Sequence, residues 1–150
     1  MTSLLPRALA AGALAVSALV AAACGPTGPQ PQVRLYTDDF SVAISFDPAP
    51  PCALEQVEFK VVVRDAKTGE PIEGGEGRIF ATNEDRKSVD NGLTPGEELG
   101  TYYTKLMFVN AGTWAIGFQF RRDSTQRLQR ANDWMQEIMA EAPPGQSCNR

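Results

Sequence analysis

The chain has 150 residues, with 14 Lys or Arg against 18 Asp or Glu, and its formal net charge is -4. This length suits one domain or at most two, and 43% hydrophobic with 21% charged residues is the composition of a globular protein. The chain contains no histidine, which excludes Ser-His-Asp catalysis, Cys-His catalysis and imidazole metal ligands, and its acidic balance argues against nucleic-acid binding.

The N-terminal 23 residues have the pattern of an export signal. Arg7 is followed by a run from Ala8 to Ala23 without a charged residue, and small residues precede Cys24. A short charged region, an apolar region and small residues before a cleavage point are typical of a secretory signal peptide. The apolar run of roughly 16 residues is shorter than the ~20 that a spanning helix needs, although an uncleaved signal anchor remains an alternative.

The end of this segment, Val20-Ala21-Ala22-Ala23-Cys24, resembles the lipobox of bacterial lipoproteins. In that family the cysteine is acylated and becomes the mature N-terminus; Ala21 departs from the leucine that is usual there. The resemblance implies that residues 1–23 are removed and that Cys24 anchors the protein in a bilayer. It also implies an extracytoplasmic location, at the outer membrane or on the periplasmic face of a membrane. Ordinary secretion, with Cys24 incidental, is the second alternative.

Residues 24–32 are rich in proline and glycine, and we expect them to form a semi-extended tether. Residues 33–122 then alternate between apolar and polar positions, which indicates antiparallel strands half buried against a core. Turn-forming residues separate these runs, and Asn91-Gly92 suggests a tight hairpin. Short strands at this spacing predict an all-β fold, an antiparallel β-sandwich. The four longest alternating runs are Phe40–Phe46, Val57–Arg64, Tyr102–Val109 and Trp114–Arg121, with shorter candidates at Val33–Tyr36 and Arg78–Thr82.

Residues 123–142 change to a helical period, and Pro143 would end that period, leaving residues 143–150 as a tail. We therefore predict an appended C-terminal amphipathic helix, which packs either on its own sandwich or on a partner. Trp134 lies beside the apolar stripe, and with Arg127 and Arg130 it forms the candidate partner-binding surface. The apolar stripe consists of Leu128, Ala131, Met135, Ile138 and Met139.

The strand region resembles the YtkA-like domain, an immunoglobulin-like module of exported bacterial proteins that is related to FixH-type proteins of cytochrome oxidase assembly. The resemblance rests on a G-x-P-(I/V)-x-G turn at Gly69–Gly74, on G-x-Y at Gly100–Tyr102 and on G-x-W at Gly112–Trp114. It implies an immunoglobulin-like sandwich. Many relatives carry Met and His between that turn and the G-x-Y strand, where they suit copper. Residues 78–91 of this chain contain neither.

If Cys24 is acylated, Cys52 and Cys148 remain. The extracytoplasmic space permits disulfides, and we predict that these two cysteines pair; two unpaired thiols are the alternative. The bond would close a loop of nearly 100 residues and contribute up to about 4–5 kcal/mol in the entropic model.

No catalytic constellation is visible, because the paired acids Asp38-Asp39, Glu84-Asp85 and Glu97-Glu98 have the pattern of solvated loop residues. We therefore expect no enzyme activity, no catalytic residues, no cofactor and no metal site. The sequence predicts a lipid-anchored, non-catalytic binding or scaffold module, such as an accessory subunit of a membrane or envelope complex. The alternative function is periplasmic copper handling or oxidase assembly, and a third class is a peptide or small-molecule binder that uses a sheet edge.

Overall fold

The computed structural model describes residues 31–148, which form ten β-strands. The signal peptide, Cys24 and most of the predicted tether lie outside the described residues. Within the described part of the chain, no helix is long and apolar enough to span a bilayer. The strands are β1 (Gln32–Tyr36), β2 (Phe40–Asp47), β3 (Gln56–Asp65), β4 (Glu76–Asn83), β5 (Ser88–Gly92), β6 (Thr94–Pro95), β7 (Thr101–Met107), β8 (Gly112–Arg121), β9 (Gln129–Arg130) and β10 (Trp134–Ile138).

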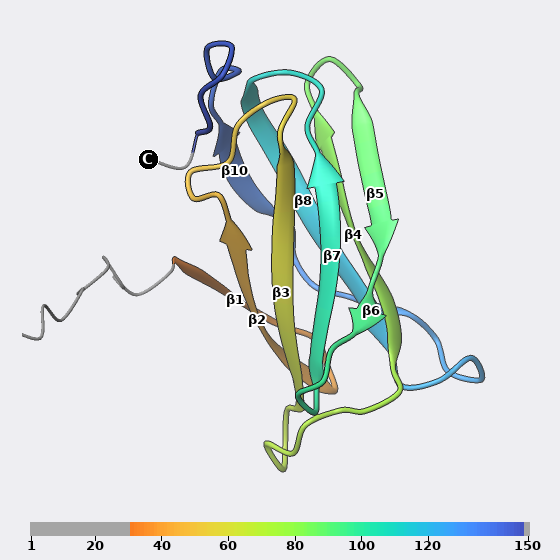
Figure 1. The fold of residues 1–150 in the computed structure, drawn as a ribbon. Helices are drawn as coiled ribbons and strands as arrows, with labels where there is room; N and C mark the ends of the chain where they lie inside the picture. Colours follow the sequence, from red (N-terminus) through yellow and green to blue (C-terminus); the bar gives the residue numbers. More distant parts are fainter. Residues whose placement is uncertain (1–30, 149–150) are drawn as a thin grey trace, which may run out of the picture.

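The strands form two antiparallel sheets that pack face to face (Figure 1). The first sheet has the order β1-β2-β3-β7-β6, and the second has the order β10-β8-β4-β5 with β9 also paired to β8. The prediction of an all-β antiparallel sandwich is therefore confirmed. The long alternating runs of the sequence became β2, β3, β7 and β8, because one face of each strand is buried in the core.

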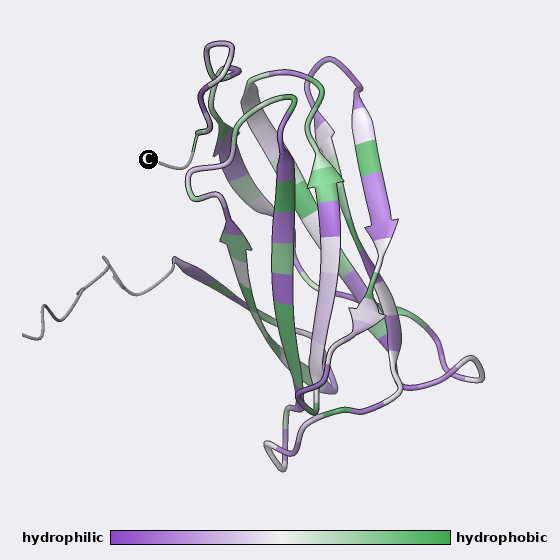
Figure 2. Ribbon diagram, in the orientation of Figure 1, coloured by the Kyte–Doolittle hydropathy of each residue, from purple (hydrophilic) through white to green (hydrophobic). Residues whose placement is uncertain are grey.

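The core lies between the sheets and is rich in aromatic side chains. Figure 2 shows the alternation of hydrophobic and hydrophilic residues along β3 that places one set inside. Tyr102 and Trp114, from the G-x-Y and G-x-W pieces, are both fully buried. The Tyr102 hydroxyl donates to the Ile72 carbonyl at 2.6 Å and accepts from the Gly75 amide at 3.1 Å. These two hydrogen bonds of the Tyr102 hydroxyl fix the chain before β4. Burial of the hydroxyl raises the pKa of Tyr102.

The predicted C-terminal helix over residues 123–142 is wrong. This segment contains β9 and β10, which pair antiparallel with β8. Trp134 lies opposite Ile116, so the inward positions of β10 alternate with period two. The physical reason is that β8 would otherwise leave an unpaired backbone edge, and pairing that edge outweighs a helical period in the side chains. The sandwich therefore extends to Ile138, and its predicted end at residue 122 is corrected accordingly.

The expected hairpin at Asn91-Gly92 is also wrong. The turn between β4 and β5 lies at residues 84–87, where Arg86 has a φ of 60°. Asn91 and Gly92 instead end β5, and the Asn91 side-chain amide donates to the Lys105 carbonyl of β7 at 3.1 Å. The Asn-Gly pair therefore marks the point at which the chain leaves the second sheet for the first.

Candidate functional site

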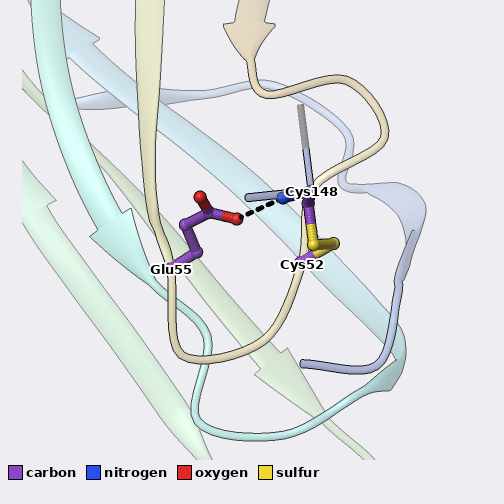
Figure 3. Close-up of side chains that lie close together, drawn as sticks. All are labelled: Cys52, Glu55 and Cys148. Atoms are coloured by element: carbon purple, nitrogen blue, oxygen red, sulfur yellow. Dashed lines mark hydrogen bonds between the residues drawn. A yellow bond between two sulfur atoms is a disulfide. The ribbon is translucent and has the colours of Figure 1, made fainter. Parts of the chain in front are cut away.

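Cys52, Glu55 and Cys148 lie together at one end of the sandwich (Figure 3). Cys52 and Glu55 belong to the loop between β2 and β3, whereas Cys148 belongs to the segment after β10. The disulfide predicted between Cys52 and Cys148 is present, with a sequence separation of 96 residues and a Cα–Cα distance of 6.2 Å. It joins a loop of the first sheet to the segment that follows the last strand of the second.

Backbone hydrogen bonds hold the two segments of this site beside each other. The Ala53 amide donates to the Met139 carbonyl at 3.0 Å, and the Met139 amide donates to the Pro51 carbonyl at 2.9 Å. Cys52 and Met139 thereby form a short parallel bridge. These hydrogen bonds fix the chain after β10 against the β2–β3 loop nine residues before Cys148, in addition to the disulfide.

Glu55 holds the end of the described chain through both carboxylate oxygens. Oε1 accepts from the Ser147 hydroxyl at 2.8 Å, and Oε2 accepts from the Cys148 amide at 3.1 Å. Cys52 is buried, whereas Cys148 is only half-buried. The disulfide is therefore open to solvent on the Cys148 side, and exposed disulfides are the ones that exchange readily with external thiols.

The same three residues form the only group of three potential Cys, His, Asp or Glu metal ligands within residues 31–148. Their ligand atoms all lie within 4.8 Å of one another. In the disulfide form the two sulfurs are bonded to each other and offer no thiolate. Reduction would leave two thiols and a carboxylate, and cysteine sulfurs that give up their protons bind soft ions such as Cu(I) and Zn²⁺.

Other ligand sets in the described residues fit a soft metal less well. The chain has no histidine. Met107 is at the end of β7 in the first sheet, whereas Met135 is on β10 in the second, and both side chains are exposed. Glu55 was not identified from the sequence. The spacing Cys52-x-x-Glu55 was a signal for it, but this signal becomes specific only once the chain end is known to return to this loop.

The three residues of the predicted partner-binding surface do not form one exposed patch. Trp134 lies on the inward side of β10 and packs against the core, and its indole nitrogen is buried without a hydrogen-bond partner. Arg130 is engaged by Asp133 through two hydrogen bonds of 2.9 and 2.8 Å. Arg127 is exposed in the loop before β9. An exposed tryptophan flanked by arginines, as the hypothesis requires, is therefore not found.

Comparison with known proteins yields no family and no relative from sequence. No protein-family model matches the chain, and no curated protein matches it. These two sequence comparisons therefore support neither the YtkA-like resemblance nor the lipoprotein prediction.

Solved structures with a similar fold do exist. A DUF4426 family protein of Pseudomonas aeruginosa superposes with a TM-score of 0.55 and 14% identity, covering 74% of this chain and 97% of that one. A copper-bound variant of FetP from uropathogenic Escherichia coli superposes with a TM-score of 0.51 and 9% identity, covering 76% of this chain and 94% of that one. At these identities the similarity shows a shared β-sandwich fold.

Proposed function

We propose that this protein handles a soft metal ion, copper above all, outside the cytoplasm. The observation that carries the proposal is the convergence of Cys52, Glu55 and Cys148 within 4.8 Å. A protein of similar fold, FetP, has been solved with copper bound, and this supports the choice of copper over Zn²⁺. The proposed ligands are thiolates and a carboxylate, because the chain has no imidazole to offer.

The proposed location is extracytoplasmic, with Cys24 acylated and inserted in the outer membrane or the periplasmic face of a membrane. The signal-like residues 1–23 support export. The Cys52–Cys148 disulfide supports the same location, because disulfides persist in oxidising compartments and are rare in the cytosol.

In the proposed mechanism the redox state of the disulfide controls metal binding. A dithiol reductant transfers two electrons and two protons to the Cys52–Cys148 bond, which yields two thiols and the disulfide of the reductant. One Cu(I) ion then replaces the two thiol protons, with Glu55 as the third potential ligand. Because Cys148 is half-buried, its sulfur is within reach of the reductant. Release would need a disulfide oxidant, which takes two electrons from the two cysteine sulfurs and two protons from water, becomes a dithiol, and leaves the Cys52–Cys148 bond re-formed and the ion free.

The test is a Cu(I) titration of the full chain against a chromophoric Cu(I) chelator, in the disulfide form and after reduction. We expect one Cu(I) per chain in the reduced form and none in the disulfide form. Cys52→Ser and Cys148→Ser should each abolish retention, and Glu55→Gln should weaken it. Met135→Leu is the matched control, because it removes an exposed sulfur from β10. Equal binding by both redox forms, or retention by Cys52→Ser, would contradict the proposal.

The second candidate function is a non-catalytic binding or scaffold module, an accessory subunit of a membrane or envelope complex; no enzyme role is proposed. One observation favours it: a hollow lies between the β1–β2 turn and the loop before β9, lined by Thr37, Asp38, Arg127, Leu128 and Asn132 among others. The test is a mild-detergent pull-down of the tagged protein from its native membranes. Recovery of a stoichiometric set of membrane proteins that is lost with Arg127→Ala would support this function. Recovery of the tagged protein alone would contradict it.

A further inference from the structure

The outer face of the first sheet contains a hollow along β2. Three successive outward residues of β2 are small: Ser41, Ala43 and Ser45. Arg34 on β1 lies opposite Ala43, and Arg64 on β3 lies opposite Ser41. Because adjacent strands are ~4.8 Å apart, side chains of β1 and β3 stand about 10 Å apart across β2. Short side chains between long ones leave a hollow of about 250 Å³.

The hollow is lined by two arginines without acidic partners. Neither Arg34 nor Arg64 forms an ion pair with another residue of the range 31–148, and the Arg64 guanidinium donates only to the Gly69 carbonyl, at 3.0 Å. The outward acids of β2 and β3, Asp47 and Glu58, lie opposite each other at the other end of these strands, and Glu98 forms an ion pair with Lys60. Two guanidinium groups without ion pairs on the two sides of one hollow, in an acidic protein, favour an anionic ligand, and above all a phosphate.

Apolar surface accompanies the two charges. Tyr36 pairs with Ser41 across the strands, and its side chain is 66% exposed. Val62 pairs with Ala43 and forms part of the lining. An aromatic ring and aliphatic groups beside two guanidinium groups fit a ligand that carries an apolar portion next to its phosphate, and a phospholipid headgroup with its glycerol has that composition.

The hollow is formed in part by β1, which follows the apolar N-terminal segment closely in the sequence. Gln32, the first residue of β1, also lines the hollow. Residues 24–31 separate β1 from the uncharged run Ala8–Ala23. A stretch of about eight residues spans at most about 29 Å when fully extended. A protein anchored in a bilayer at Cys24 therefore holds this face within reach of the headgroups.

We propose that this hollow binds the phosphate of an anionic phospholipid headgroup, with Arg34 and Arg64 donating to its oxygens. The ligand class follows from the unpaired charges, and the lipid source follows from the distance to the anchor. The inference rests on the anchored location in the proposed function and is independent of metal binding at Cys52 and Cys148. Binding here would lay the first sheet against the membrane and turn the second sheet outward.

The experiment uses the full chain in a nonionic detergent and dissolved dihexanoyl-phosphatidylglycerol as the probe. The arginine Nε–Hε resonances of Arg34 and Arg64 are followed by NMR during the titration. We expect both resonances to shift in one saturable transition, whereas the zwitterionic dihexanoyl-phosphatidylcholine binds at least about tenfold more weakly. Arg34→Gln and Arg64→Gln should each weaken phosphatidylglycerol binding about tenfold or more, because each removes a charge-assisted hydrogen bond.

Two further variants keep the test decisive. Arg86→Gln removes an exposed arginine from the β4–β5 turn and should leave the affinity unchanged. Ala43→Leu keeps both arginines but fills the floor of the hollow with a larger side chain. This variant should abolish phosphatidylglycerol binding. Equal affinity for phosphatidylcholine, or full affinity in Ala43→Leu, would overturn the proposal. Inorganic phosphate that binds as tightly as the lipid would overturn the lipid assignment in favour of a soluble anion.

The dissolved lipid separates this inference from the rest of the proposed function. Its binding does not require that Cys24 be acylated, and it does not depend on the redox state of Cys52 and Cys148. Loss of Cu(I) binding with intact lipid binding would therefore reject only metal handling. Mass spectrometry of the membrane-extracted protein tests the anchor itself, because an unmodified Cys24 would remove the argument for a lipid source.

Discussion

The two outer faces of the sandwich use arginine in opposite ways. On the second sheet Arg121 binds Glu76 at 2.7 Å and Arg130 binds Asp133 at 2.8 Å, so each charge is neutralised within the protein. On the first sheet Arg34 and Arg64 have no carboxylate partner within residues 31–148. The same residue type therefore completes the structure on one face and remains available to a ligand on the other.

The second face is also closed by packing. The Phe80 ring lies under two guanidinium groups, with the Arg78 carbon 5.4 Å and the Arg130 carbon 4.8 Å from the ring centre. Phe80 pairs with Gly117 across β4 and β8, and the absence of a side chain there makes room for the ring. No equivalent cover lies over Ala43 on the first face, where the hollow is open within the part of the chain that the structure describes.

The largest expected effect concerns the disulfide that joins the two sheets. Cys148→Ser should lower the free energy of unfolding by about 2–4 kcal/mol, because the unfolded chain gains the freedom of a long open loop. Both sheets should persist, since β10 stays paired to β8 through its backbone. Urea unfolding followed by circular dichroism measures this loss. Collapse of the whole fold would show that the disulfide is strictly structural and would weaken the proposed redox control.

The next effect concerns the packing of the closed face. A Cβ on Gly117 would lie 2.3 Å from Phe80 Cζ, so Gly117→Ala should destabilise the protein by about 1–3 kcal/mol. Gly92→Ala is the matched control, because its nearest neighbour is a carbonyl oxygen at 3.9 Å. Thermal unfolding of the two variants compares them directly. A Gly117→Ala protein as stable as Gly92→Ala would show that the face tolerates rearrangement.

A smaller effect separates the paired arginines from the unpaired ones. Arg121→Gln should cost about 0.2–1 kcal/mol, the range of exposed ion pairs, because Glu76 loses its partner. Arg34→Gln should leave stability unchanged to within about 0.5 kcal/mol, because no internal ion pair is lost. Urea unfolding at low salt measures both. A stability loss in Arg34→Gln equal to that of Arg121→Gln would remove the contrast between the faces.

The smallest effect is a pH dependence at the edge where the sheets meet. Hydrogen bonds from the Thr68 and Lys67 amides lower the pKa of Asp65 from its ordinary value of 3.8, and Arg122 lowers it further. A lowered pKa in the folded state stabilises the protein above the ordinary value, and this contribution is lost as the pH falls below 3.8. Asp65→Asn should therefore lose stability at neutral pH but little in strong acid. An unchanged pH profile of unfolding would contradict this assignment.

Much of the sandwich could be predicted because half-buried strands leave a period of two in the sequence. Phe40, Val42 and Ile44 on β2 carry that signal on their own. β10 does not, because Gln136 occupies one of its inward positions and Met135, an outward one, is apolar. The spacing of Leu128, Ala131 and Met135 then imitates a helix. Only the unpaired edge of β8 decides the conformation, and that edge is a property of the assembled sheet.

The candidate sites could likewise be predicted only in part, because they too depend on how the strands are assembled. The pairing of Cys52 with Cys148 followed from the cysteine count, whereas the role of Glu55 required knowledge of where the chain end returns. The hollow along β2 depends on which strands flank it. Alternation places Arg34 and Arg64 on outward positions, but only the register of β1-β2-β3 brings them to the two sides of one row of small residues.

The measurement that tests the proposed metal handling most directly is copper K-edge X-ray absorption of the full-length protein, reduced and loaded with one equivalent of Cu(I). We predict a coordination shell of two sulfurs that disappears in Cys148→Ser and is unchanged in Met135→Leu. A sulfur shell that persists in Cys148→Ser, or copper that is lost on desalting of the reduced protein, would contradict metal handling by the Cys52–Glu55–Cys148 site.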